Sequence, residues 1–221
     1  MELISQTEEN YLKAIFKIVE REGKPANTNA IAAEMNTKAA SVTDMVIRLS
    51  EKELINYEKY KGVTLTATGN KLATHLIRKH RLWEVFLVEK LAFSWDEVHD
   101  MAEQLEHIQA PKLVERLDAF LGSPKFDPHG DPIPDAEGVF ATRKQSPLLE
   151  LLPGEKGIVV GVQDHTTPFL QYLDRLDLIL GSKVEIIERF AYDESVKILL
   201  NNEKEQLLSK KVAQNLFVQK Q

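Results

Sequence analysis

The sequence of 221 residues contains no cysteine, and this absence limits the chemistry of any site in it. Without thiols there can be no disulfide, no thiolate zinc site and no cysteine nucleophile. A bound metal must therefore take nitrogen and oxygen ligands, which favour Mn(II) or Fe(II) over a structural zinc ion.

The sequence also lacks a long apolar run and a basic N-terminus. No apolar run approaches the ~20 residues needed to span a bilayer, and the opening segment MELISQTEEN is acidic where a signal peptide would be basic. We expect a cytoplasmic protein that does not contact a membrane. Its length allows two or three domains, and its 43% apolar and 28% charged residues are ordinary for a globular chain.

The sequence also has no excess of positive charge, with 28 lysines and arginines against 34 aspartates and glutamates. The net charge of −6 argues mildly against a constitutive nucleic-acid binder, because neutralising phosphates supplies much of nonspecific affinity. The acidity lies outside residues 1–75, which contain 10 lysines and arginines against 10 aspartates and glutamates. Charge therefore leaves DNA binding open for the N-terminal part of the chain.

One segment, VHDMAEQLEH at residues 98–107, carries imidazoles and carboxylates at helical spacing. His99, Glu103, Glu106 and His107 follow one another at offsets of four, seven and eight, which fall on one stripe of a helix. Such a donor set suits a divalent cation such as Mn(II), Fe(II) or Zn(II). The spacing therefore predicts part of a metal site.

A second pair, His80 and Glu84, lies one turn apart on what we predict to be the preceding helix. Two facing helices could then enclose the metal. A charged helix with a solvated face would produce the same spacing, so the spacing alone leaves both interpretations open.

The N-terminal part carries the pattern of a helix-turn-helix. An amphipathic helix is predicted between a capping box at Ser5 and Glu8 and the helix-ending Gly23. Residues 28–35 then predict a short helix and residues 38–53 a longer one, joined by a tight turn.

Alternating residues at 55–66 predict a two-stranded hairpin, which adds a wing beside the longer helix. In winged domains that helix enters the major groove and the hairpin meets the DNA backbone. We expect the base edges to be approached by Lys38, Ala40, Ser41, Thr43 and Asp44. We expect phosphates to be contacted by Lys59 and Lys61 at the hairpin tip, although a solvated turn explains that tip equally well.

The rest of the chain is predicted to contain a helical region, a linker and a β-rich region. We place the boundaries at residues 1–72 for the DNA-binding domain, 73–122 for the helical domain, 123–147 for a proline-rich linker and 148–221 for the β domain. Strands are expected at 157–163, 183–189 and 196–200, around a short helix begun by Pro168. His129 in the linker is expected to be a solvated loop residue.

The order and separation of four features resemble those of the diphtheria-toxin-repressor and manganese-regulator family. These features are the hairpin, the segments RKHRLWE and VHDMAEQLEH, and the later GDPIP. The resemblance covers essentially the whole chain. It implies a mainly α protein with a small β domain: a winged helix-turn-helix, a helical metal-binding and dimerisation domain, and an SH3-like (FeoA-like) β domain. It also implies a repressor, not an enzyme, that binds double-stranded operator DNA as a homodimer when it holds Mn(II) or, alternatively, Fe(II).

The resemblance assigns ligands by position. It implies one metal site from His80, Glu84 and His99, and another from Glu103, Glu106 and His107. Iron-responsive relatives often carry cysteine at the position of Glu103, so the carboxylate there favours Mn(II).

Three positions depart from the family pattern. Asn10 replaces a methionine or aspartate and can ligate only through a neutral amide oxygen, while Lys13 stands where short manganese regulators have glutamate. In the β domain the family's additional ligands would fall near Asp164, His165 and Pro168; proline cannot coordinate, so His165 is either a replacement ligand or a surface histidine.

Two other classes of protein fit parts of the sequence. A di-metal carboxylate enzyme could use the same stripe, but such bundles commonly take Glu-x-x-His pairs from several helices, whereas Glu106 and His107 are adjacent. A winged-helix regulator that senses a small organic molecule would leave the histidines merely structural.

Overall fold

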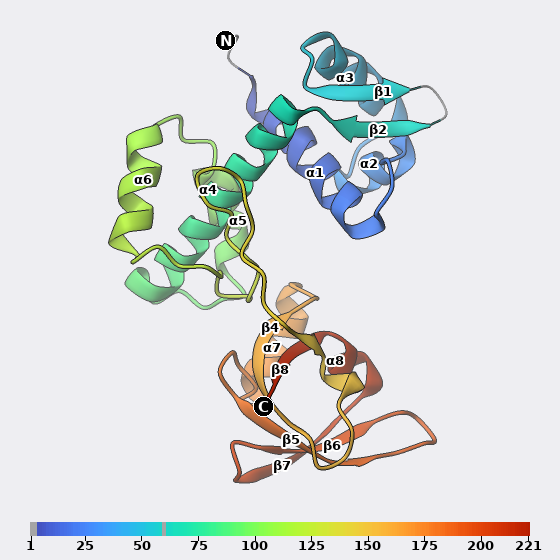
Figure 1. Ribbon diagram of the computed structural model, residues 1–221, viewed down its shortest axis with the longest axis vertical. Coiled ribbons are helices and arrows are strands. Elements are labelled where there is room, and N and C mark those ends of the chain that lie inside the picture. The colour runs from blue at the N-terminus through green and yellow to red at the C-terminus, as the bar shows by residue number, and fades with distance from the viewer. Residues whose placement is uncertain (1–3, 59–60) are drawn as a thin grey trace. The chain divides into compact units, whose positions relative to one another are not determined.

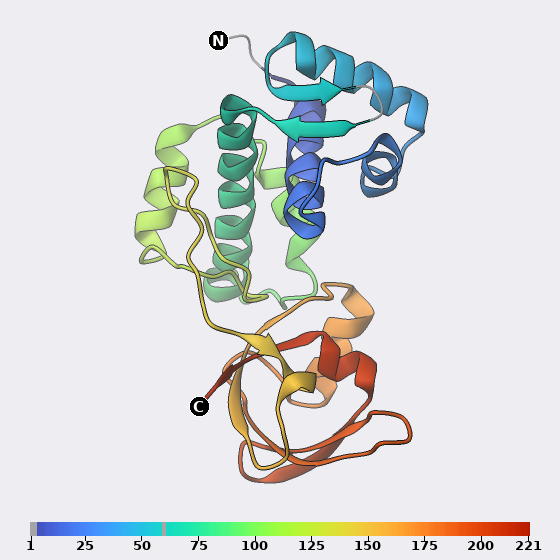
Figure 2. The same ribbon diagram turned by 45° about the vertical axis from the view of Figure 1, so that its right-hand side comes forward.

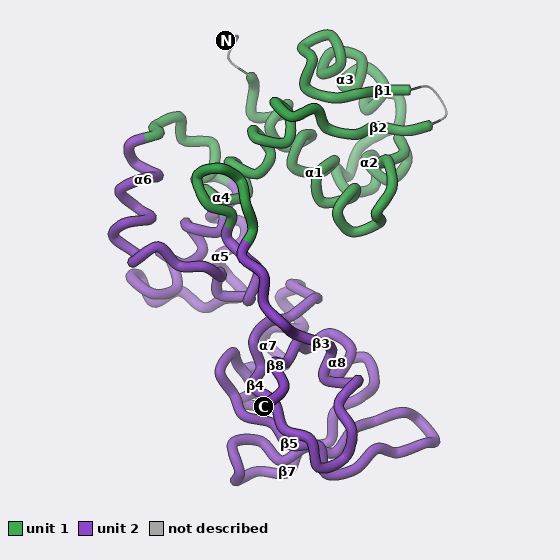
Figure 3. Tube along the Cα trace, viewed as in Figure 1, with its two compact units in different colours: residues 1–80, 104–111, 134–140 green, residues 81–103, 112–133, 141–221 purple. Residues whose placement is uncertain are grey.

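The computed structural model describes residues 4–58 and 61–221, and Figure 1 shows its elements in chain order. The chain divides into two compact units, which Figure 3 colours green and purple. Unit 1 comprises residues 1–80, 104–111 and 134–140. Unit 2 comprises residues 81–103, 112–133 and 141–221.

Unit 1 begins with the predicted helices, and local signals set their ends. α1 (Gln6–Glu22) starts at the capping box, in which the Glu8 N–H donates to the Ser5 hydroxyl and the Ser5 N–H donates to the Glu8 carboxylate. It ends at Gly23, whose φ of 64° suits a residue without Cβ. α2 (Thr28–Glu34) and α3 (Ala39–Glu51) follow, so the helix-turn-helix prediction is confirmed.

The predicted wing is an antiparallel hairpin of β1 (Ile55–Glu58) and β2 (Gly62–Leu65). Figure 2 shows this hairpin in cyan beside α1 and α3. The helices and the hairpin share one apolar core, which includes Leu12, Ile15, Ile31, Val46, Leu49 and Val63. This core fixes α3 against the hairpin and leaves the opposite face of α3 exposed.

The three helices of the central region are α4 (Ala67–Leu91), α5 (Val98–Leu105) and α6 (Pro111–Phe120). α4 is continuous and passes from unit 1 to unit 2 after His80. α5 is shorter than predicted, so Glu106 and His107 lie in the turn that follows it. The expectation of a single helical stripe from His99 to His107 is therefore wrong.

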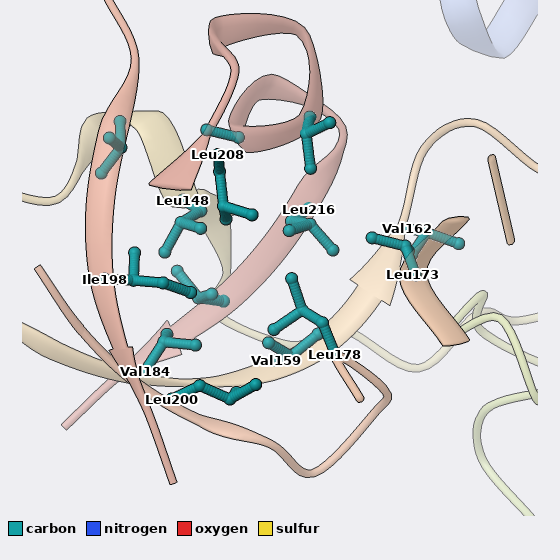
Figure 4. Close-up of a cluster of buried hydrophobic side chains, with 14 of the residues drawn as sticks. Leu148, Val159, Val162, Leu173, Leu178, Val184, Ile198, Leu200, Leu208 and Leu216 are labelled. Atoms are coloured by element: carbon teal, nitrogen blue, oxygen red, sulfur yellow. The ribbon is translucent and has the colours of Figure 1, made fainter. Parts of the chain in front are cut away.

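The β domain in unit 2 contains a six-stranded sheet in the order β3-β8-β4-β5-β6-β7. Its strands are β3 (Ser146–Pro147), β4 (Lys156–Val162), β5 (Lys183–Arg189), β6 (Val196–Leu200), β7 (Lys204–Leu208) and β8 (Leu216–Lys220). The short helices are η1 (Leu148–Glu150), α7 (Thr167–Arg175) and α8 (Lys210–Gln214). Figure 4 shows apolar side chains such as Leu148, Val159, Ile198 and Leu216 gathered in the core of this domain. The three expected strands are confirmed, while β7, α8 and β8 were not predicted.

The proline-rich segment is more ordered than a linker. Isolated β-bridges pair Phe126 with Pro132 and Pro134 with Phe140. His129 is only 2% exposed, so the expectation of a solvated histidine is wrong. Among the described helices, none is long and apolar enough to cross a membrane.

Candidate metal centres and DNA-binding surface

A buried trio of potential ligands lies within unit 2. Glu84 comes from α4, and Asp127 and His129 come from the segment that follows α6. Their exposed fractions are 2%, 5% and 2%, and one donor atom from each lies within 4.8 Å of the other two. Buried carboxylates are rare unless a cation or hydrogen bonds compensate their charge, so this trio fits a metal ion.

Backbone hydrogen bonds orient this trio. His129 Nε2 lies 2.8 Å from the carbonyl oxygen of Trp95, which can only accept, so Nε2 carries the proton. The other nitrogen, Nδ1, lies 3.7 Å from Glu84 Oε2. One oxygen of Asp127 accepts the N–H groups of His129 and Asp131 at 2.9 and 3.0 Å. This arrangement, a fixed imidazole beside two carboxylates, is common around metal ions.

Burial and neighbouring charges favour the protonated forms of Asp127 and His129. Burial, reinforced by the charges of Glu84 and Asp131, raises the pKa of Asp127 to about 7. Burial alone would lower the pKa of His129, but Glu84 and Asp127 outweigh it and raise that pKa to about 9. A metal ion that binds here would therefore take the place of protons.

Two of the ligands predicted from the sequence lie next to the trio, and a third, Glu103, lies beside one of these two. The ring of His165 stacks on that of His129, with centroids 4.8 Å apart. His99 Nδ1 lies 3.4 Å from Glu84 Oε1, and His99 Nε2 lies 3.8 Å from Glu103 Oε1. His165 is thus a partly buried neighbour of the trio, and burial lowers its pKa.

A second cluster of charged groups lies within unit 1, around the fully buried Glu106. Lys13 Nζ donates to both oxygens of Glu106, at 2.7 and 2.9 Å. His80 Nδ1 lies 2.6 Å from Glu106 Oε2. The carboxylate of Glu106 and the imidazole of His80, which the resemblance assigns to different sites, are therefore in contact.

His107 joins this cluster, and Asn10 lies on α1 between Glu9 and Lys13, both of which contact the cluster. The Nδ1 atom of His107 donates to Glu9 at 2.6 Å, so the lone pair of its Nε2 remains for another partner. This Nε2 lies 3.8 Å from Glu106 Oε1. Asn10 Oδ1 is buried and accepts no hydrogen bond. An imidazole nitrogen, a carboxylate and an amide oxygen without a hydrogen bond are donors that suit a divalent cation.

The segment after α6 contributed the ligands that sequence analysis missed. Asp127 and His129 lie in a loop, where no helical or strand period reveals that two side chains will meet. The sequence DPHGD is the one available signal, because it places acids on both sides of a histidine.

The N-terminal turns of α3 present the predicted base-reading residues to solvent. The exposed residues are Lys38, Ala40, Ser41, Thr43 and Asp44, and the side chains of Val42, Val46 and Leu49 point into the core. Arg48 is also exposed and was not predicted. Lys61 is exposed and forms an ion pair of 2.6 Å with Glu58, whereas Lys59 lies outside the described residues.

Comparisons with known proteins match all three regions of the chain. Residues 3–63 match the family model described as iron dependent repressor, N-terminal DNA binding domain. Residues 66–135 match iron dependent repressor, metal binding and dimerisation domain, and residues 146–220 match the FeoA domain. The diphtheria toxin repressor of Corynebacterium diphtheriae is 30% identical over 200 residues, which cover 86% of this chain and 88% of that protein.

The chain belongs to the iron-dependent repressor family. A second relative, the diphtheria toxin repressor of Corynebacterium jeikeium, is 33% identical over 145 residues, which are 66% of this chain and 60% of that protein. A solved structure titled manganese-dependent transcriptional repressor complex with manganese has a TM-score of 0.88 and 32% identity, and covers 97% of this chain and 100% of its own.

Membership of the iron-dependent repressor family settles the class of function. The protein is a metal-dependent, DNA-binding transcriptional repressor and not an enzyme. The expected order of a helical DNA-binding domain, a helical dimerisation domain and a C-terminal FeoA domain is confirmed.

Proposed function

We propose that a divalent cation switches this repressor into its operator-binding form as a homodimer, and that the cation is Mn(II), with Fe(II) as the alternative. Relatives in the comparisons are named for manganese or for iron. The candidate donors in this chain are oxygens and imidazole nitrogens, and the chain has no cysteine. Oxygen-rich sites without thiolates suit Mn(II).

The buried trio of Glu84, Asp127 and His129 is the observation that carries the proposal. Two carboxylates at 2% and 5% exposure are costly unless protons or a cation neutralise them. A dication would supply that charge without protons. We assign His99, Glu103 and His165 as candidates for the remaining positions of this centre, because His99 and His165 border the trio and Glu103 lies 3.8 Å from His99.

We assign a second centre to Asn10, Glu106 and His107 in unit 1, with His80 beside Glu106. Its support is the buried oxygen of Asn10 without a hydrogen bond and the free Nε2 of His107 near Glu106. Glu9 orients His107 by accepting the proton on its other nitrogen.

The cation acts as a population shift. It stabilises the operator-binding arrangement by the difference between its affinities for that arrangement and for the alternatives. Dimerisation through the helical region agrees with apolar side chains exposed there, such as Phe120 at 65% and Leu113 at 39%. In the dimer we expect two copies of α3 to read the two half-sites of an operator.

The test is operator binding by purified protein in chelator, in Mn(II), in anaerobic Fe(II) and in Zn(II). We expect Mn(II) or Fe(II) to raise operator affinity at least about tenfold. Equal affinity in Mn(II) and in chelator would refute the switch. Manganese-soaked crystals should give anomalous peaks at the trio, and peaks elsewhere only would refute that assignment.

The same titration tests the small-molecule alternative. Trp83 and Trp95 both lie in unit 2, and Trp95 accepts the hydrogen bond from His129. Metal bound at the trio should change the tryptophan fluorescence. A protein with merely structural histidines would not respond.

A further inference from the structure

The ammonium of Lys13 lies where the second metal centre needs a cation. Its Nζ is 2.7 Å from Glu106 Oε1, the oxygen that faces His107 Nε2 at 3.8 Å. It is also 2.9 Å from Glu106 Oε2, so it bridges both oxygens as a bidentate metal ion would. The side chains of Lys13 and Glu106 are 7% and 0% exposed, so water does not screen this contact.

The charges of this cluster already balance. Two buried carboxylates, Glu9 and Glu106, lie with two buried ammonium groups, Lys13 and Lys79, and Lys79 Nζ is 3.9 Å from Glu9 Oε1. A dication that bound Glu106 beside Lys13 would place four positive charges, two from the ammonium groups and two from the metal, against two carboxylates in a site with little water. Like charges at contact distance in such surroundings repel strongly.

We propose that Lys13 is a resident cation that the metal displaces from Glu106, and that it thereby sets the metal concentration at which the second centre fills. The inference rests on the proposed function, since it concerns the same centre. In the metal-free protein Lys13 neutralises Glu106 and keeps the turn after α5 attached to α1. When the metal binds Glu106 and His107, the ammonium leaves the two oxygens.

A stable structural ion pair is the alternative. In that case the metal would bind around an intact Lys13–Glu106 contact, or through His107 and Asn10 only. Removing the ammonium would then weaken the fold and leave metal affinity unchanged or lower. Displacement therefore predicts a gain in metal affinity when the ammonium is removed, whereas the structural ion pair predicts no gain.

The first test is Mn(II) titration of Lys13→Met, measured by calorimetry in an Asp127→Asn background that weakens the other centre. Methionine keeps the length and apolar body of lysine without its charge. We expect Mn(II) to bind about tenfold more tightly or better, because no ammonium competes. Lys13→Arg keeps a cation and should bind no more tightly than the parent.

Lys79→Met is the matched control. It removes one positive charge from the same cluster, but from a residue whose Nζ lies 3.9 Å from Glu9. We expect Lys79→Met to change the Mn(II) affinity less than about threefold, because the Lys79 ammonium lies beside Glu9 and would act on the metal only through its charge. Equal gains in both variants would show a general charge effect and overturn the displacement.

A second measurement uses the unmutated protein, so it does not depend on the folding of a variant. Lys13 should resist amine acylation in chelator and react in saturating Mn(II), as read by peptide mass spectrometry. Metal binding without a rise in Lys13 labelling would overturn the inference. Failure of the unmutated protein to bind Mn(II) would instead refute the proposed function.

Discussion

Replacing Asp127 by asparagine should raise the free energy of unfolding of the metal-free protein at pH 8 and lower that of the metal-bound protein. Asparagine has nearly the same shape, and its oxygen can still accept the backbone N–H groups of His129 and Asp131. What changes is the charge, and with it the ion pair of 3.4 Å between Asp127 Oδ2 and Arg81 Nε. In chelator the carboxylate destabilises the fold at neutral pH, because burial raises its pKa from 3.8 to about 7.

The magnitude follows from this shift. Above pH 4 the unfolded chain releases the proton of Asp127, while the folded protein keeps it until about pH 7. Stability therefore falls as pH rises through this window. The difference between a pKa of 3.8 in the unfolded chain and about 7 in the folded protein corresponds to about 4 kcal/mol at pH 8. His129, whose pKa is raised to about 9, adds a further loss of stability between about pH 6.5 and 9, and this loss is smaller in the variant because the charge of Asp127 contributes to the raised pKa.

The assay is urea unfolding of both proteins at pH 4 and pH 8, followed by the fluorescence of Trp83 and Trp95. In chelator the unmutated protein should lose about 4 kcal/mol more than Asp127→Asn between the two pH values. In Mn(II) at pH 8 the order should reverse, because the variant lacks a charged ligand. If the unfolding free energies of the two proteins changed equally with pH in chelator, a destabilising charge on the buried Asp127 would be refuted.

Three further outcomes are expected. Asn10→Asp should tighten Mn(II) binding at the second centre by about tenfold in calorimetry, because it adds a charge to an orphaned ligand oxygen; unchanged binding would remove Asn10 from the centre. Gly130→Ala should cost at least about 2 kcal/mol in urea unfolding, since a Cβ there would lie 2.1 Å from the carbonyl oxygen of Val160, whereas Gly154→Ala, with a similar φ and open space, should cost about 1 kcal/mol. Lys61→Ala should weaken all DNA sequences alike and lower the slope of log affinity against log salt by about one; a loss confined to one operator base in competition assays would contradict a phosphate contact.

Neighbouring residues determine those parts of the structure that were predicted correctly from the sequence. The capping box at Ser5 and Glu8 and the left-handed Gly23 mark both ends of α1 in the sequence and in the structure. The same holds for the hairpin predicted at residues 55–66, which the structure has as β1 and β2. Such features depend on residues a few positions apart, so a single sequence contains the information.

The predictions were wrong where contacts between residues far apart in the sequence determine the position of a side chain. Helical spacing placed Glu106 and His107 on α5, but Lys13 and Glu9 of α1 hold these side chains in the turn beyond it. The burial of His129 likewise depends on the carbonyl of Trp95, which lies 34 residues earlier in the chain. β7 was not predicted because it has little apolar alternation, and only Leu208 among its residues is buried.

The two proposed centres differ in what neutralises their buried carboxylates when no metal is bound. In unit 2, protons on Asp127 and His129 offset the buried carboxylates, so a metal ion must compete with hydrogen ions. In unit 1 the ammonium of Lys13 offsets Glu106, so the metal must compete with a side chain of α1. Since α1 also packs in the core that supports α3, the second centre is the one whose occupancy acts directly on the DNA-binding domain. Filling it therefore changes a contact of that domain, whereas filling the centre in unit 2 changes the charge within its own unit.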